Sequence, residues 1–277
     1  DTGDLILDGD SSISGNTSDK IEINNTSSLI SARDVILDAE SGGILANGNF
    51  TVEAGRDIRL NDALNISHEL NLLADQNTSG EGSIYTQGDI ISGNNNITLR
   101  SADIELSNSI NAGSASVNMV SSGSAMGLGL YDDVDYNLSN DEILKITAAN
   151  LIVGDDISGE LFVEGVTAVS TDNISDTVTL VGGLVGEKVS FVNSASSFNQ
   201  LAVNADGGIA VDADLTTVAG TMLLDADSDN TGSLDSLQIA DGITLSSTGD
   251  MQLDATNGGI LASGNLNLLS DGNILVN

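Results

Sequence analysis

Hydrophobic and polar residues alternate in short runs along much of the chain. The apolar pairs Phe50 and Val52, and Ile97 and Leu99, are each separated by one polar residue. A period of two places both members of a pair on one face of a β-strand. Small polar residues or glycines follow most of these runs. The pattern predicts many short strands, each with one buried face.

An opening phrase, in which Asp precedes alternating apolar residues, recurs along the chain. It reads Gly-Asp-Leu-Ile-Leu at 3–7, Arg-Asp-Val-Ile-Leu at 33–37, Arg-Asp-Ile-Arg-Leu at 56–60 and Gly-Asp-Met-Gln-Leu at 249–253. A strand unit repeated in this way is typical of a solenoid, in which each coil stacks on its neighbours.

Between residues 35 and 120 the predicted strands divide into coils of three. The first strands begin at Val35, Ile58, Ile84 and Ile104, so successive coils have similar lengths. Three short strands in roughly 20–25 residues match one turn of a parallel β-helix. We therefore predict an all-β, right-handed parallel β-helix. An antiparallel sandwich is the structural alternative, and it would need tight hairpin turns between paired strands.

One region interrupts this rhythm. Residues 121–146 predict an irregular coil or insertion, and within them Ser139 and Glu142 have capping-box spacing before an apolar run. We expect one short external helix near 139–146. The whole of 1–277 is predicted to be a single continuous β-helix segment of a longer repetitive protein.

A longer repeat links the two ends of the chain. Residues 17–61 align with 233–277 at an offset of 216, with 17 identities in 45 positions. The strongest block pairs Gly-Gly-Ile-Leu-Ala at 42–46 with the same sequence at 258–262. One interpretation is general likeness between coils, and the other is a parent protein built of long tandem repeats.

Composition restricts the core and the partners. Hydrophobic residues make up 40% of the chain but aromatic residues only 3%, so we expect an aliphatic core. The chain has no Cys, which excludes disulfides and thiolate metal sites. The net charge of −34 excludes nucleic acid, which needs a basic surface. No apolar stretch approaches the roughly 18 residues of a membrane-spanning helix, so we expect no membrane insertion.

The openers, the Gly-Gly-Ile phrases and the segment 138–155, which reads LSNDEILKITAANLIVGD, carry a family likeness. They resemble the filamentous haemagglutinin-like family of very large β-helical exoproteins of Gram-negative bacteria, which leave the cell by two-partner secretion. The resemblance implies an adhesive shaft, secreted or at the bacterial cell surface in association with the outer membrane. An adhesin of this kind would bind a host-cell, neighbouring-cell or glycan surface. The resemblance carries over no catalytic residue. Independently of the resemblance, the open ends of a β-helix are unpaired sheet edges, so we expect neighbouring repeats or further copies to stack on them end to end.

The alternative function is a β-helical polysaccharide lyase or glycosidase, which needs clustered carboxylates or a basic set beside calcium. Arg56 and Arg59 with Asp57 form the best basic group, and we interpret it as an exposed ion pair. His68, the single histidine, is interpreted as a polar turn residue. Few aromatic rings are available to stack on sugars. We expect no catalysis and no required cofactor.

Calcium is the best candidate ligand. Asp225, Asp227 and Asp229 alternate in the way that hard oxygen ligands begin a calcium loop. The segment departs from the EF-hand pattern at Asn230, where that loop has glycine, and at Ser236, where it has glutamate. A solvated acidic turn is the competing interpretation. A second candidate for calcium is the set Asp132, Asp133 and Asp135.

Overall fold

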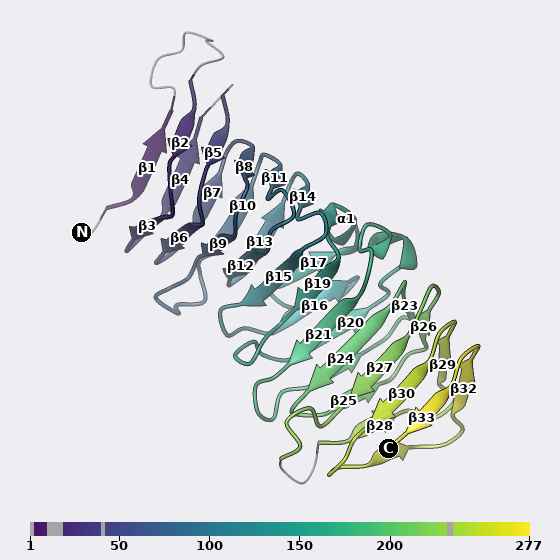
Figure 1. The fold of residues 1–277 in the computed structure, drawn as a ribbon. Coiled ribbons are helices and arrows are strands. Elements are labelled where there is room, and N and C mark those ends of the chain that lie inside the picture. The colour runs from purple at the N-terminus through teal and green to yellow at the C-terminus, as the bar shows by residue number, and fades with distance from the viewer. Residues whose placement is uncertain (1–2, 10–18, 40–41, 232–234) are drawn as a thin grey trace. The chain divides into compact units, whose positions relative to one another are not determined.

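The computed structural model describes residues 3–9, 19–39, 42–231 and 235–277, which form short strands in parallel sheets (Figure 1). The chain divides into two compact units. Unit 1 comprises 1–123 and 145–149, and unit 2 comprises 124–144 and 150–277. The expected all-β, parallel architecture is confirmed. That 1–277 form one continuous β-helix stays a prediction.

Unit 1 holds three sheets of short strands. The first has the order β1 (Leu5–Asp8), β4 (Val35–Asp38), β7 (Ile58–Leu60), β10 (Ser83–Thr86) and β13 (Asp103–Leu106). The second has the order β2 (Ile21–Ile23), β5 (Ile44–Ala46), β8 (Leu64–Ile66), β11 (Ile90–Ile91), β14 (Ile110–Asn111) and β18 (Ile146–Thr147). The third has the order β3 (Ser27–Ser31), β6 (Phe50–Ala54), β9 (Leu70–Leu73), β12 (Ile97–Ser101) and β15 (Ser116–Ser121).

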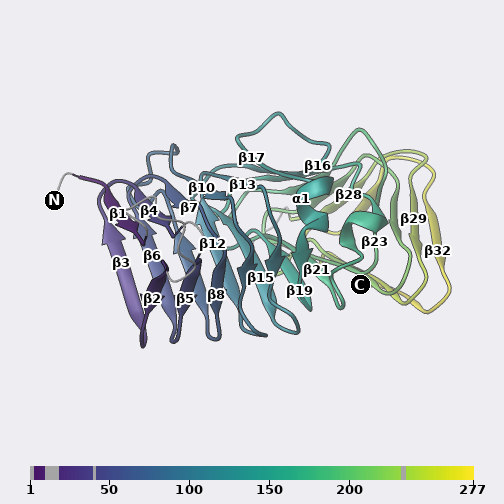
Figure 2. The same cartoon turned by 90° about the horizontal axis from the view of Figure 1, so that it is seen from above.

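The four predicted first strands are neighbours in one sheet of unit 1. Val35 pairs with Ile58, Ile58 with Ile84, and Ile84 with Ile104, all in parallel register. Figure 2 shows the strands of this unit following one another in layers. Parallel pairing between strands this far apart in sequence rules out hairpins, so the antiparallel sandwich is wrong.

The core consists of like side chains stacked in columns. Ile44, Leu64, Ile90 and Ile110 occupy matched positions in the second sheet of unit 1, and each is at most 1% exposed. Polar partners between them, such as Asn65, point outward. Alternation therefore buries one aliphatic face of each strand, and the columns supply the hydrophobic stabilisation.

Turns at the corners are bonded from one layer to the next. Asn25 and Asn94 both have φ of 69°, a left-handed conformation that asparagine tolerates. The Asn94 Oδ1 atom accepts a hydrogen bond from the Ser114 backbone N–H at 3.0 Å, and Asn47 Nδ2 donates to Asn24 Oδ1 at 3.1 Å. Outside the core, these side-chain hydrogen bonds therefore link successive layers in the same way as the strand pairing does.

Unit 2 is also built from parallel strands. One sheet contains β19 (Asn150–Val153), β21 (Val178–Gly182), β24 (Leu201–Ala205), β27 (Met222–Asp225), β30 (Met251–Asp254) and β33 (Ile274–Val276). Another has the order β17 (Tyr136–Ser139), β16 (Met126–Gly129), β20 (Leu161–Glu164), β22 (Val189–Phe191), β25 (Ile209–Val211), β28 (Leu237–Ile239) and β31 (Ile260–Ala262). The last has the order β23 (Ser196–Phe198), β26 (Leu215–Thr217), β29 (Thr244–Ser247) and β32 (Asn267–Ser270).

The predicted helix is confirmed as α1 (Asn140–Leu144). The Ser139 backbone N–H donates to Glu142 Oε2 at 3.0 Å, and the Glu142 N–H donates back to Ser139 Oγ at 3.3 Å, which is a capping box. A second short helix, the 3₁₀ helix η1 (Ala168–Thr171), is one that the sequence pattern does not predict. No described helix of the chain is long and apolar enough to cross a membrane.

The chain passes from one unit to the other after residues 123, 144 and 149, and the first two of these points lie in the region 121–146 that the sequence marks as irregular. There β16 and β17 pair in parallel although only a short loop joins them, with Met126 opposite Tyr136. The loop carries Tyr131, whose ring stacks on Phe162 with centroids 4.5 Å apart.

Candidate cation site

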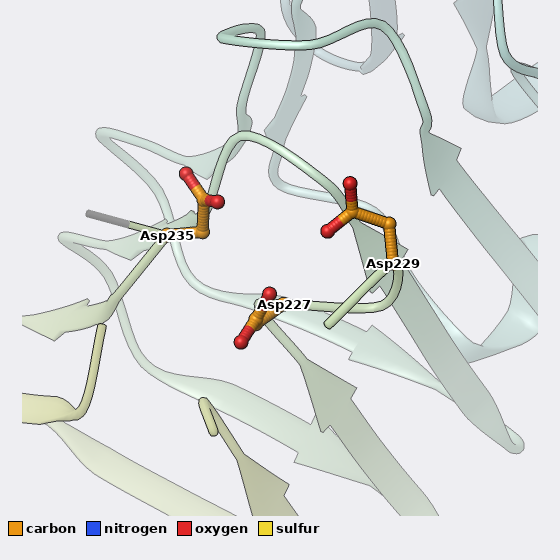
Figure 3. A group of neighbouring side chains, drawn as sticks. All are labelled: Asp227, Asp229 and Asp235. Carbon is orange, nitrogen blue, oxygen red and sulfur yellow. The ribbon is translucent and has the colours of Figure 1, made fainter. Parts of the chain in front are cut away.

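A cluster of three carboxylates forms in unit 2 at the turn between β27 and β28. Asp227 and Asp229 follow β27, and Asp235 precedes β28. Each side chain places one carboxylate oxygen within 4.8 Å of the others. Figure 3 shows Asp229 and Asp235 on either side of Asp227.

Local backbone bonds shape this turn. The Asp227 N–H donates to Asp225 Oδ1 at 3.2 Å, and the Asn230 N–H donates to the Asp227 carbonyl at 3.1 Å. Asn230 has φ of 52°, the left-handed conformation that reverses the chain. The turn is held to the preceding layer because the Ser228 N–H donates to the Ala205 carbonyl.

Asp227 is the buried member of the cluster, with 1% of its surface exposed. Its Oδ2 accepts hydrogen bonds from the backbone N–H and the side-chain amide of Asn257, at 2.7 and 2.8 Å. Asn257 lies after β30, one layer further along unit 2. The Asp227 Oδ1 atom is also buried and has no hydrogen-bond donor among the described residues.

The pKa values of the carboxylates in and beside the cluster shift in different directions. Burial, and then the negative charges of Asp227, Asp229 and Asp206, raise the pKa of Asp235. The pKa of Asp229 is lowered, chiefly because the Thr231 hydroxyl and N–H both donate to it. Burial is the main cause that raises the pKa of Asp225, although the Asp227 N–H partly offsets it. Negative charge is therefore concentrated in a place where part of it is shielded from water.

The structure brings together two of the three carboxylates that the sequence singles out. Asp227 and Asp229 belong to the cluster, whereas Asp225 lies in β27 and accepts the Asp227 N–H instead. Asp235 is a member that sequence reasoning missed. The signal that could have found it is an acidic residue at the far end of the same turn, directly before Ser236 and the next alternating strand.

The other candidates stay apart from this cluster. Among the described residues, the carboxylates of Asp132, Asp133 and Asp135 do not form a comparable group, and all three side chains are exposed. His68 is exposed, and its Nδ1 lies 3.1 Å from Ser67 Oγ.

The basic group of unit 1 consists of ion pairs. Arg56 binds Asp34 through two contacts, from Nε at 3.0 Å and from Nη2 at 2.8 Å. Arg59 donates to Asp57 at 2.7 Å, and its guanidinium lies 4.1 Å from the centre of the Tyr85 ring. These cations are therefore engaged by neighbouring side chains.

No protein-family model, curated protein or solved structure matches this chain.

Proposed function

We propose that this chain is a non-catalytic structural segment. It would form part of the adhesive shaft of a large filamentous protein that is secreted or held at the bacterial cell surface, in association with the outer membrane. The likeness of its openers and of 138–155 to the filamentous haemagglutinin-like family favours this setting. Such a shaft needs no cofactor, and its adhesive partner would be a host-cell, neighbouring-cell or glycan surface.

The finer fold that we propose is a right-handed parallel β-helix. Each coil would contain three short strands in about 20–25 residues. The pairings in unit 1 support this size, because Val35 lies opposite Ile58 and Ile84 lies opposite Ile104, which are steps of 23 and 20 residues. Right-handedness is expected because crossovers between parallel strands overwhelmingly take that hand.

The observation that carries the proposal is a strand-for-strand match between the two ends of the chain. The strands β2 to β7 in unit 1 correspond in order to β28 to β33 in unit 2, at the offset of the sequence repeat. The registers agree as well: Val35 pairs with Ile58, and Met251 pairs with Ile274, with the same separation along the sequence. The repeat therefore preserves pairing as well as sequence, which is the property expected of a modular shaft.

The matched strands differ in what covers them. Ile58 and Leu60 of β7 are fully buried, because β10 of the next layer pairs with them. Their counterparts Ile274 and Val276 in β33 are 43% and 54% exposed. β31, β32 and β33 are each the last strand of their sheet, so unit 2 presents an open layer. Unpaired strand edges of this kind bind further strands readily.

We propose that this layer is covered by a neighbouring repeat of the same protein or, for the isolated chain, by a second copy. At the opposite end of the strand order, β1, β2 and β3 are likewise terminal strands of their sheets in unit 1. Contact between the last layer of one copy and the first layer of another joins two different surfaces, and such head-to-tail contacts propagate into fibres. The partner surface has the same strand pattern as layers that already stack within the chain.

Sedimentation of the 277-residue chain over a wide range of concentrations tests this proposal. The test is best made in moderate salt, which screens the repulsion between acidic copies. We expect concentration-dependent association that Ile274→Lys abolishes, because its side chain lies on the inward face of the open layer. Leu275→Lys is the matched control: Leu275 has similar exposure, 49%, but pairs with the outward-facing Gln252.

Two results would contradict the proposal. One is a chain that stays monomeric at every concentration. The other is association that Ile274→Lys and Leu275→Lys affect equally. A parallel assay on acidic polysaccharides tests the alternative function, and cleavage of any of them by the purified chain would favour a lyase or glycosidase.

A further inference from the structure

We propose that Asp227, Asp229 and Asp235 form a calcium site that locks the turn between β27 and β28. This inference goes beyond the shaft and end-to-end stacking, since neither requires a metal. It rests on the cluster geometry and on a separate observation at Asp227.

The separate observation is the unpartnered oxygen of Asp227. The residue is 1% exposed, and its Oδ1 is buried without a donor among the described residues. A buried polar atom left in this way costs free energy, and a charged one costs more. The other oxygen is fixed by two hydrogen bonds from Asn257, so the side chain cannot turn to satisfy both. A cation in front of Oδ1 removes the penalty.

The distances fit one shared ion. Calcium binds oxygen ligands at about 2.3–2.6 Å, so two ligands on opposite sides of the ion lie about 5 Å apart. The three carboxylate oxygens are within 4.8 Å of one another. Calcium tolerates irregular geometry and completes its coordination with water, whereas magnesium demands a near-ideal octahedron. Three carboxylates, with water completing the coordination, therefore suit calcium better than magnesium.

The charge balance also favours a cation. Ion pairs in the described part of the chain join Lys20 to Glu22, Arg33 to Asp4, Arg56 to Asp34 and Arg59 to Asp57, and none of these involves the cluster. Asp206 adds a further negative charge to the field at Asp235. Asp235 also lines an open hollow of about 550 Å³, and Lys188 lines the same hollow without forming an ion pair with the cluster.

Binding would cross-link several segments of unit 2. The ion would join the start of the turn, at Asp227 and Asp229, to its end at Asp235. Through the Asn257 hydrogen bonds it would also stiffen the connection to the turn after β30. The chain has no cysteine and so no disulfides, and a bound metal ion is another way to link Asp227 and Asp229 to Asp235.

Calorimetric titration of the chelator-treated chain with calcium chloride tests the site. We expect one ion per chain, with a Kd of about 10⁻⁴ to 10⁻³ M, as in extracellular calcium modules. A tenfold excess of calcium over Kd should raise the melting temperature by about 3 °C. Magnesium chloride at equal ionic strength controls for general screening of the acidic surface.

Three variants locate the ion. Asp227→Asn and Asp229→Asn should each abolish both the heat of binding and the thermal shift. Because Asp229 is exposed, Asp229→Asn tests the site even if Asp227→Asn fails to fold. Asp212→Asn is the matched control that should retain both, because Asp212 is an exposed aspartate of unit 2 outside the cluster. The proposal is overturned if the parent chain gives no heat, if Asp229→Asn binds as well as the parent, or if magnesium reproduces the calcium effect.

Discussion

At the scale of single residues, the contact between Asp34 and Arg56 shows how the layers of unit 1 are tied together outside the core. The two residues come from successive layers and meet through a two-point contact of 2.8 and 3.0 Å. Only 13% of the Asp34 side chain is exposed, against 43% for Arg56. Most surface ion pairs contribute little, but a bidentate pair with a shielded carboxylate is a favourable case.

This contact predicts a pH dependence. The hydrogen bond from Arg56 is the main cause that lowers the pKa of Asp34. A lowered folded-state pKa gives stability that is present above the unfolded value of about 3.9 and is lost as pH falls through the folded value. Arg56→Met should therefore lower the melting temperature at neutral pH, and the difference from the parent should vanish in strong acid.

Lys20→Met is the control for this prediction. It removes the same charge from an ion pair in which the side chains of both partners, Lys20 and Glu22, are well exposed, at 43% and 44%. Thermal melts of the parent and both variants across the acidic range make the comparison. A deficit of Arg56→Met that is constant with pH, or one that Lys20→Met matches, would contradict the assigned role of Asp34.

At the scale of elements, the turns limit how closely successive layers can approach. Gly88 lies between β10 and β11, against the turn that joins β7 to β8. A Cβ atom added there would lie 2.1 Å from the carbonyl carbon of Asp62 and 2.2 Å from the Ala63 nitrogen. Both are backbone atoms, so neither can rotate away, and glycine is required by close approach rather than by a special backbone angle.

Gly88→Ala should accordingly destabilise unit 1 by about 1–3 kcal/mol, the range for forcing extra atoms into packed structure. Denaturant melts followed by circular dichroism measure the effect. Gly3→Ala is the control, since nothing lies within 4 Å of its added Cβ. Equal stability of the two variants would show that the layers are not in such close contact at Gly88.

The strands of unit 1 could be predicted because each repeats the same local signal. Ile58 and Leu60 alternate with Arg59, and the preceding Asp57 marks where the strand begins. β16 carries no such signal: its sequence is Met-Gly-Leu-Gly, and all four residues are buried. Its pairing with β17 depends on how the loop between them folds. Strand-like alternation is informative only where one face meets solvent.

The cation cluster could be predicted only in part, for a related reason. Asp227 and Asp229 lie close together in one turn, so the sequence itself makes them neighbours. Asp235 joins them only in the folded structure, where it lies directly before β28. Asp227 accepts hydrogen bonds from Asn257, which lies far away in the sequence and in the next layer. Neither contact leaves a mark on the local pattern.

At the scale of the whole molecule, the same layer pattern occurs twice along the chain. Residues 21–61 and 237–277 share their strand order and their registers, yet one set is covered by a further layer and the other is not. The acidic charge of the chain opposes association of copies, whereas the apolar, unpaired strands of the last layer favour it. End-to-end stacking occurs if strand pairing outweighs this repulsion.

Amide hydrogen exchange measured by mass spectrometry at low and high protein concentration tests this claim most directly. Residues 44–60 serve as an internal reference, because their strands match those in 260–276 but are covered on both sides. In dilute solution, 260–276 should exchange much faster than 44–60, since unpaired edge amides exchange from the native state. At high concentration, exchange in 260–276 should slow toward the reference, and Ile274→Lys should prevent this. Exchange in 260–276 that is equally fast at all concentrations would contradict the account.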